Sequence, residues 1–203
     1  QLKSIHDIWP NFHVYVHGGV FMDPFVERLN KLTGRPVILL DTYLASEGYF
    51  AYQTSPKNSG MTLLMNNSIF FEFVPFNTEY FTLSGELIDL YQAYTISEVQ
   101  PGIDYALVIS TNAGLWRYMI GDLIQFIDTT THEIKITGRI KQFLSLCGEH
   151  LSLDNINNAL LFVCKKEGLS ISEYTIHADE QNLQHCWCLG CDQEIDADEL
   201  ISA

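Results

Sequence analysis

Hydrophobic and polar positions near the start of the chain predict a strand, a helix and a second strand. FHVYVHGG (12–19) is typical of a strand that ends in glycines. DPFVERLNKLTG (23–34) is typical of a helix with Asp23 as N-cap and Gly34 at its end. RPVILLDTYL (35–44) is a continuous apolar run, as in parallel strands that are covered on both faces. These patterns predict a βαβ unit.

From Met61 to Thr137 the pattern changes to short runs of strand-forming residues. Asn-Asn, Pro-Gly, Asn-Ala-Gly and Thr-Thr-Thr sequences separate the runs and are typical of turns. The runs are MTLLM, IFFEFVPF, GELIDLYQAY, DYALVIST, LIQFID and EIKIT. Their spacing predicts an antiparallel sheet or barrel.

After TGRIK the pattern changes again. QFLSLCGEHLSL reads as a strand pair or a strand with a turn, and DNINNALLFVCKKEG (154–168) as a helix capped by Asp154 and closed by Gly168. SEYTIHA and QHCWCLG alternate as two strands. We therefore expect an α/β unit and an antiparallel, barrel-like region in residues 1–138, and a small, incomplete α+β unit in residues 139–203.

Composition narrows the class of protein. With 203 residues, 47% of them hydrophobic, the chain can bury a core of about one or two domains. No apolar run reaches the ~18 residues that a membrane helix needs, so we expect no membrane association. The net charge of −14 disfavours a nucleic-acid partner, because phosphate binding requires clustered Lys and Arg.

The cysteines point to a reducing compartment. Their number, five, is odd, and a core of this size does not need disulfides, so we expect a cytoplasmic protein. The stretch HCWCLGC (185–191) contains thiols and an imidazole, which are zinc ligands. Cys188 and Cys191 have the usual spacing but lack a second pair, so a strand is favoured over a zinc site.

Two glycine-containing or polar stretches follow the predicted strands of the βαβ unit, where ligands gather in α/β sheets. HGGVF (17–21) lets the backbone approach a flat ligand, or is a tight strand-to-helix turn. DTYLASEG (41–48) offers an aromatic ring, a hydroxyl and a carboxylate suited to a base, a phosphate and Mg²⁺. The alternative for the second stretch is a loop in which Ser46 caps a helix.

Two further candidate stretches lie later in the chain. YMIGD (118–122) places Gly121 and Asp122 inside an apolar run; the carboxylate can accept hydrogen bonds from ribose hydroxyls, or the pair forms a turn or bulge. TGRIKQF (137–143) has an arginine that can reach a nucleotide and a lysine where two domains would bend, or it is a hairpin turn with two solvated bases.

The order of these four stretches resembles that of the adenylate-forming enzymes, the superfamily of acyl-CoA synthetases, peptide adenylation domains and luciferases. WPNFHVYVHGGV, TYLASEG, RYMIGD and GRIKQFLSL are most similar to the GH3 auxin-responsive family of acyl acid amido synthetases. The resemblance covers Ile8 to about Leu160. It implies ATP-dependent conversion of a carboxylic acid to acyl-AMP, followed by transfer to an amine such as an amino acid.

The resemblance also implies roles for individual residues. In the nucleotide site, Asp122 would bind the ribose hydroxyls and Arg139 would contact the nucleotide. Glu47 would hold Mg²⁺ and act in catalysis, and Lys141 would be the hinge. The remaining nucleotide contacts would be Gly18, Gly19 and Val20 against the adenine and acyl groups, Tyr43 against the nucleotide, and Ser46 near its phosphate.

Two departures from the family pattern qualify this picture. The phosphate loop rich in Gly, Ser and Thr that family members carry before the glycine pair is not present, so we expect the chain to be the C-terminal part of a ligase and inactive by itself. Plant members have a lysine shortly after the arginine motif, where this chain has His150. His150 is therefore the candidate for the cation that activates the acid.

Two other functions stay open from the sequence. One is an acyl-CoA ligase in which a thiol accepts the acyl group. The other is a non-catalytic module that retains the fold and binds nucleotide without turnover.

Overall fold

The computed structural model describes residues 3–19, 21–82, 85–141, 151, 153–169, 171–179 and 182–191. The described residues form four helical segments. Two are short 3-10 helices, η1 (Ile5–Asp7) and η2 (Asp23–Phe25), and two are α-helices, α1 (Val26–Thr33) and α2 (Leu153–Glu167). The strands are β1 (Val14–Gly18), β2 (Ile38–Ala45), β3 (Gly48–Tyr52), β4 (Met61–Leu63), β5 (Ile69–Pro75), β6 (Asp104–Thr111), β7 (Tyr118–Asp128), β8 (Glu133–Arg139), β9 (Ile171–Asp179) and β10 (Gln184–Cys191).

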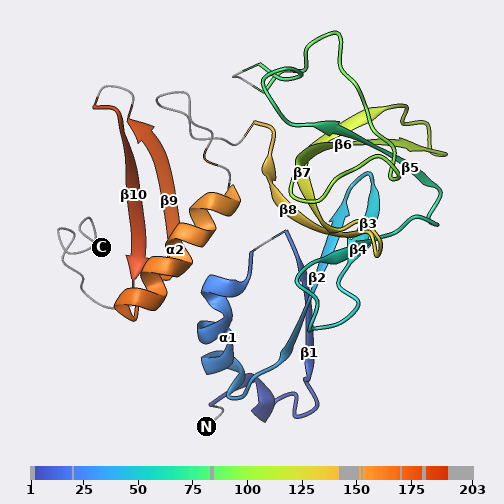
Figure 1. Cartoon of the computed structure of the whole chain (residues 1–203). Helices are drawn as coiled ribbons and strands as arrows, with labels where there is room; N and C mark the ends of the chain where they lie inside the picture. The colour runs from blue at the N-terminus through green and yellow to red at the C-terminus, as the bar shows by residue number, and fades with distance from the viewer. Residues whose placement is uncertain are drawn as a thin grey trace.

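An eight-stranded sheet forms most of the structure, in the order β1-β2-β3-β4-β8-β7-β6-β5. Strands β1 and β2 are parallel, and all other neighbours in this sheet are antiparallel. The sheet curls strongly in the part that strands β3, β4, β5, β6, β7 and β8 form (Figure 1). Because of this curl, strands that are distant in the sheet order can face one another.

The main core lies inside the curl. It is rich in aromatic rings, which meet edge to face; Phe73, for example, lies 5.1 Å from Phe126 and 6.2 Å from Tyr105 between ring centroids. Phe50 and Phe73 are fully buried. A second cluster on the other side includes Val74, Val108 and Leu123. The two clusters hold β7 from both faces, which makes it a rigid support for the residues it carries.

The predicted βαβ unit is confirmed, since β1 and β2 are parallel and α1 connects them. Gly34 ends α1 with φ of 80°, as expected of a C-cap. Two details were wrong. Asp23 is not an N-cap, because it begins η2, and Phe25 occupies the N-cap position of α1. The strand over 35–44 is not covered on both faces, because Ile38 is 45% and Leu44 63% exposed.

One predicted strand is also wrong. Within GELIDLYQAY (85–94) the structure has only isolated bridges, Phe81 to Leu87 and Phe73 to Tyr94. Leu87, Tyr91 and Ala93 pack against the second cluster. The alternating pattern of this segment therefore reflects the packing of its side chains on the second cluster. The Phe73–Tyr94 bridge connects the segment to the edge strand β5 without forming a strand.

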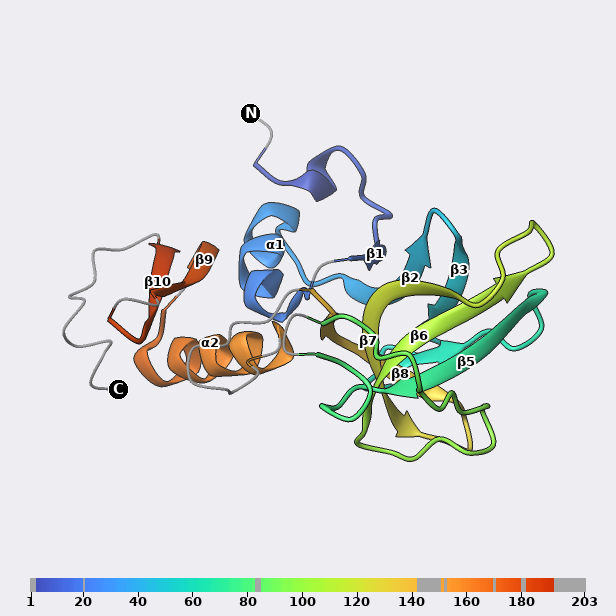
Figure 2. The ribbon, with the colours of Figure 1, turned by 90° about the horizontal axis from the view of Figure 1, so that it is seen from above.

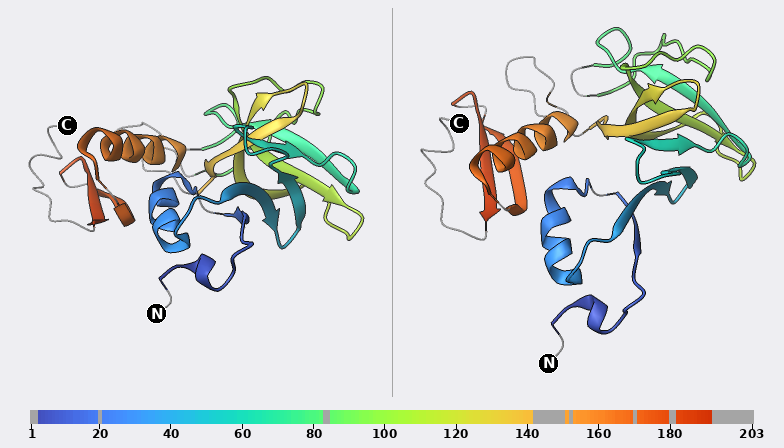
Figure 3. Two further views of the ribbon diagram at one scale, coloured as in Figure 1. Left: turned by 90° about the horizontal axis from the view of Figure 1, so that it is seen from below. Right: turned by 60° about the horizontal axis from the view of Figure 1, so that its bottom comes forward.

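The predicted helix and strand pair after residue 150 are confirmed as α2, β9 and β10, and β9 pairs with β10 in a separate antiparallel sheet. Asp154 lies inside the first turn, because α2 begins at Leu153. In this unit α2 lies beside α1 and contacts β8, whereas β9 and β10 lie on the side away from the curled sheet (Figures 1, 2 and 3). The predicted strand pair over 142–153 falls mostly outside the described residues. No helix of the described part has the length and apolarity to cross a membrane.

Candidate functional site

Gly121 and Asp122 lie inside strand β7, at a bulge. The pairing of β7 with β6 shifts register between Ala106 and Val108, opposite residues 120–122. Gly121 has φ of 94°, a backbone conformation that residues with a side chain rarely adopt. Its carbonyl accepts a hydrogen bond from the Ile140 N–H at 2.8 Å. The bulge interpretation of YMIGD is therefore correct, and the bulge sets the direction of the next residue.

Asp122 is the centre of a buried polar group. The residue is 6% exposed, and its Oδ2 accepts a hydrogen bond from the Tyr43 hydroxyl at 2.8 Å. Its Oδ1 pairs with Nε of Arg139 at 2.9 Å. Asp122 and Arg139 are directly opposite each other on β7 and β8, whereas Tyr43 reaches them from β2 across the curl. The structure thus brings together three residues that sequence analysis selected in three separate stretches.

Burial and charge keep Tyr43 protonated. The residue is 4% exposed, and this burial is the main reason why the pKa of its hydroxyl is raised. The nearby Asp122 carboxylate raises the pKa further, while Arg139 opposes the change. The hydroxyl therefore acts as a donor to Asp122, and it leaves the second carboxylate oxygen to Arg139.

Arg117 anchors the start of β7, a feature that sequence analysis missed. Its guanidinium binds Glu72 of β5 through two nitrogens, each at 3.0 Å, and lies 5.4 Å from the centre of the Tyr91 ring. A two-point contact of this kind fixes direction as well as distance. It steadies the turn that leads into the bulge. A signal was present in the sequence, because Arg117 directly precedes YMIGD.

Ser46 and Glu47 form the two-residue turn between β2 and β3, where Ala45 pairs with Gly48. The alternative in which Ser46 caps a helix is therefore wrong, because a strand follows. Ser46 is exposed and Glu47 half-buried. The Glu47 carboxylate has no hydrogen-bond or ion-pair partner among the described residues, and its charge raises the pKa of Tyr43. A carboxylate at such a turn is available to a ligand.

The two glycines at the end of β1, Gly18 within the strand and Gly19 directly after it, differ in what requires them. A Cβ on Gly18 would lie 2.6 Å from the Thr42 carbonyl oxygen, so only glycine allows β1 and β2 to approach this closely. Gly19 has open space around it but φ of 73°. The bend and positive φ at Gly19 agree with a change of chain direction directly after β1. Val20 lies outside the described residues.

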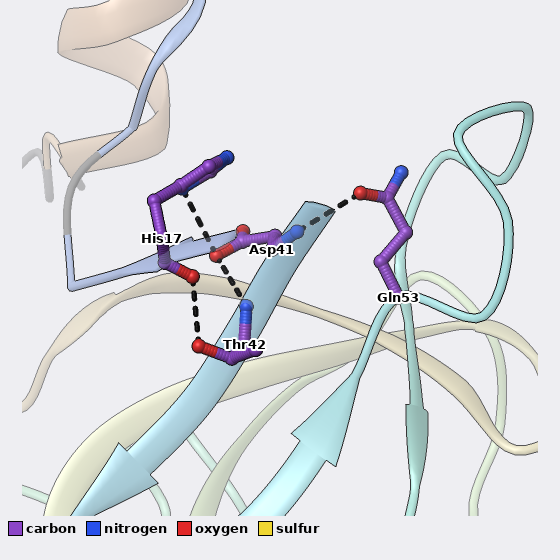
Figure 4. Close-up of polar contacts among 4 residues, drawn as sticks. All are labelled: His17, Asp41, Thr42 and Gln53. Atoms are coloured by element: carbon purple, nitrogen blue, oxygen red, sulfur yellow. Dashed lines mark hydrogen bonds and ion pairs between the residues drawn. The ribbon is translucent and has the colours of Figure 1, made fainter. Parts of the chain in front are cut away.

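A second polar pair lies at the end of β1. His17 and Asp41 are directly opposite on β1 and β2, with 3.5 Å between His17 Nδ1 and Asp41 Oδ1 (Figure 4). Sequence analysis quoted both residues but assigned neither a role. Their proximity depends on the parallel register of β1 and β2, which the sequence alone did not specify.

The other candidate residues are separate from this group. Lys141 is exposed, lies two residues after the end of β8, and has no ion-pair partner among the described residues. His150 lies outside the described residues. The part of the chain that the structure describes has no group of three His, Cys, Asp or Glu residues that could hold a metal. Cys186, Cys188 and Cys191 lie on β10 and form no disulfide with one another, in the strand that the alternation predicted.

A surface hollow of about 440 Å³ lies elsewhere, where β5 begins and β6 ends. Its walls include Phe70, Thr111 and Trp116, and none of the candidate residues above lines it. The hydrogen bonds and ion pair of Asp122 define the candidate site.

Comparison with known proteins agrees with the family resemblance that the sequence motifs indicated. Residues 62–139, which run from within β4 to the end of β8 and include Asp122, match the model of the GH3 family central domain. The indole-3-acetic acid-amido synthetase GH3.3 of Arabidopsis thaliana is 29% identical over 190 residues, 88% of this chain and 30% of that protein. Jasmonoyl–L-amino acid synthetase JAR6 of Nicotiana attenuata is 27% identical over 86% of this chain and 31% of its own length.

Solved structures have the same fold. The acyl acid amido synthetase AtGH3.15 in complex with 2,4-DB superimposes with a TM-score of 0.68 at 18% identity, over 97% of this chain and 35% of that one. Coronafacic acid ligase from Pectobacterium brasiliense gives a TM-score of 0.55 at 15% identity, over 93% of this chain and 36% of that one. The chain thus spans about a third of these relatives. Residues 62–139 match the GH3 family central domain, and the resemblance of the chain to the GH3 acyl acid amido synthetases is confirmed.

Proposed function

We propose that this chain is part of an ATP-dependent ligase that converts a carboxylic acid to acyl-AMP and transfers the acyl group to an amine, such as an amino acid. The proposal rests on the contacts of Asp122 with Tyr43 and Arg139. They occur in a chain whose curated relatives are amido synthetases. The chain spans 30% of GH3.3, so we assign the activity to the intact protein and not to this part alone.

Asp122 is suited to ribose hydroxyls. An ionised carboxylate has about four acceptor positions, and Tyr43 and Arg139 use two of those on Asp122. The bulge at Gly121 and the two cores hold the carboxylate in place before a ligand arrives, which lowers the entropic cost of binding. Arg139 is 63% exposed in its side chain, so it can turn from Asp122 toward a phosphate or ribose without leaving a buried position.

The Glu47 carboxylate fits a magnesium ion that is bound mainly by the nucleotide. Mg²⁺ is usually held through one or two protein carboxylates together with substrate phosphates and water. Glu47 is a single carboxylate at a turn, and the described residues contain no group of three or more His, Cys, Asp or Glu that could hold a metal. A site with one protein carboxylate agrees with that arrangement. When bound, the ion would neutralise phosphate charge. Ser46, beside Glu47, would donate its hydroxyl to a phosphate oxygen.

In the first half-reaction an oxygen of the acid forms a bond to the α-phosphorus of ATP, and pyrophosphate leaves. In the second, the amine nitrogen forms a bond to the acyl carbon, loses a proton, and AMP leaves with the acyl–phosphate bonding electrons. The residues of this chain would orient the nucleotide through both steps. Holding the reactants in the right geometry lowers the entropic part of the activation barrier. Lys141 after β8 would be the hinge, and His150 the candidate cation near the acid.

The remaining assignments complete the proposal. Gly18, Gly19 and Val20 would line the adenine and acyl pocket, and residues 1–138 and 139–203 would belong to a large domain and a small mobile domain. The described cysteines are free thiols, which supports a reducing, cytoplasmic location.

Pyrophosphate release by the intact protein tests the function. ATP, Mg²⁺ and a panel of carboxylic acids are supplied, and products with amino acids or CoA are identified by mass spectrometry. We expect release that depends on the acid, and an amide product. A thioester in place of an amide would establish the CoA ligase instead, and nucleotide binding without release for any acid would favour the non-catalytic module.

A further inference from the structure

His17 and Asp41 form a histidine–carboxylate pair beside the proposed nucleotide site, which is an ion pair when the imidazole is protonated. Their side chains share one face of the β1–β2 pair, because the residues are directly opposite in the register. His17 Nδ1 is buried, lies 3.5 Å from Asp41 Oδ1, and has no hydrogen-bond partner in the described structure. The His17 side chain is 10% exposed. A buried ring nitrogen of this kind is costly unless a charged or polar group faces it.

Asp41 is held in place from several directions (Figure 4). Its Oδ1 accepts a hydrogen bond from the Thr42 N–H at 2.8 Å, and its own N–H donates to Gln53 Oε1 at 3.0 Å. Burial raises the pKa of the Asp41 carboxyl, and the charge of His17 opposes that change. The carboxylate is therefore favoured by positive charge in front of it, and a protonated His17 ring would place that charge 3.5 Å away.

The backbone of His17 is fixed to the same strand. Its carbonyl accepts a hydrogen bond from the Thr42 hydroxyl at 2.7 Å. The next residue, Gly18, approaches the Thr42 carbonyl so closely that no Cβ fits. Main chain and side chain thus both connect the end of β1 to β2 at this point.

The pair lies between two parts of the proposed nucleotide site. His17 directly precedes the Gly18–Gly19 turn. Asp41 lies two residues before Tyr43 on β2, and residues two apart in a strand point to the same face. Tyr43 in turn donates to Asp122. The ion pair therefore connects the glycine turn to the strand that carries Tyr43.

We propose that His17 is a positioning residue: through its pairing with Asp41 it holds the Gly18–Gly19 turn against β2, at the place where adenine nucleotide would bind. The expected effect on nucleotide binding rests on the proposed function, whereas the His17–Asp41 pairing does not. His17 acts through Asp41 and the turn, without contact to the reacting atoms.

The test uses three variants of the intact protein. His17→Phe keeps a ring but removes both nitrogens. His17→Asn keeps an N–H donor close to the place of Nδ1. Asp41→Asn keeps the shape of the carboxyl group and removes its charge. His13→Asn is the matched control, since His13 is exposed and only one residue before β1.

The first measurement is amide hydrogen exchange at Gly18 and Gly19, which does not require nucleotide. We expect exchange to be faster in His17→Phe and Asp41→Asn by roughly threefold to thirtyfold, and restored mostly in His17→Asn. The ¹⁵N spectrum of the His17 ring should also change in Asp41→Asn. Unchanged exchange and ring spectra in Asp41→Asn would overturn the proposal, as would a His17→Asn variant no better than His17→Phe.

The second measurement is AMP binding by calorimetry, with urea unfolding as the check on folding. We expect His17→Phe and Asp41→Asn to bind AMP about tenfold more weakly, and the His13→Asn control to bind as the unmodified protein does. Equal AMP affinity in all variants, with a loosened turn, would overturn the positioning role. A protein that does not bind AMP at all would count against the proposed function, while exchange at the glycines still decides the pairing.

Discussion

The Tyr43 hydroxyl donates a hydrogen bond to the Asp122 carboxylate across 2.8 Å, although the two residues are 79 positions apart in the chain. Tyr43 lies on β2 and Asp122 on β7, with β3, β4 and β8 between them in the sheet order. The contact exists because the sheet curls around an aromatic core. It joins the two stretches that sequence analysis proposed as parts of one nucleotide site.

Replacing Asp122 should separate its structural role from its binding role. Asp122→Ala leaves the buried Tyr43 hydroxyl without its acceptor, so we expect unfolding free energy to fall by about 1–3 kcal/mol and AMP binding to be lost. Asp122→Asn keeps an acceptor for Tyr43 and should lose binding at a smaller cost in stability. Urea unfolding and calorimetry measure both. Asp128→Asn on the same strand is the control, and normal AMP affinity in Asp122→Ala would contradict the ribose assignment.

Tyr43→Phe should lower the unfolding free energy by about 1 kcal/mol at pH 7, because a buried hydrogen bond is removed. The pKa of Tyr43 is raised in the folded protein, so its contribution to stability is complete below the pKa of an unfolded tyrosine, about 10, and falls as the pH rises above it. The advantage of the unmodified protein over Tyr43→Phe should therefore shrink above about pH 10. Urea unfolding from pH 7 to 11 measures it, and a constant difference would be contrary to this account.

Gly18 and Gly121 should respond differently to a side chain. Gly121→Ala meets open space but a positive φ, so we expect a cost of about 1–2 kcal/mol that Gly121→Asn partly recovers, since Asn tolerates left-handed backbone. Gly18→Ala places a Cβ against the Thr42 carbonyl, so β1 must move, and Gly18→Asn should be no better. Thermal unfolding of the four variants measures this. Recovery by Asn at position 18 would show that backbone conformation, not space, requires the glycine.

Arg139→Gln should affect binding far more than stability. The side chain is 63% exposed, so its ion pair with Asp122 should contribute less than about 1 kcal/mol to folding. If the guanidinium contacts the nucleotide, AMP affinity should nevertheless fall by about tenfold. Arg28→Gln, on the exposed side of α1, is the control in calorimetry and unfolding. A large loss of stability with unchanged affinity would make Arg139 a structural residue only.

Glu47→Gln should change the response to Mg²⁺ and leave AMP binding largely intact. Gln keeps the size of the side chain but has little affinity for a hard cation, so acid-dependent pyrophosphate release by the intact protein should require more Mg²⁺. Titration of Mg²⁺ at fixed ATP measures the effect, and Glu79→Gln, at an exposed glutamate outside the site, is the control. An unchanged Mg²⁺ requirement would refute the metal role.

Particular residues show how far sequence analysis reached. Gly34 was expected to end a helix and does, because a C-cap glycine is a local signal. GELIDLYQAY was expected to be a strand and is not, because its alternation fits packing on the second cluster equally well. Asp23 was expected as an N-cap, but η2 begins there. Arg117 and the His17–Asp41 pair were missed, since their partners lie on other strands.

By itself, the sequence determined the kinds of elements, the approximate order of helix and strands, and the four stretches with candidate chemistry. These depend on periodicity, turn residues and neighbours within a few positions. Only the tertiary structure decided that Tyr43, Asp122 and Arg139 meet, that the bulge at Gly121 aims the carboxylate, and that His17 faces Asp41. Such contacts join residues far apart in the chain, so they depend on strand register and on the curl of the sheet, which local patterns do not specify.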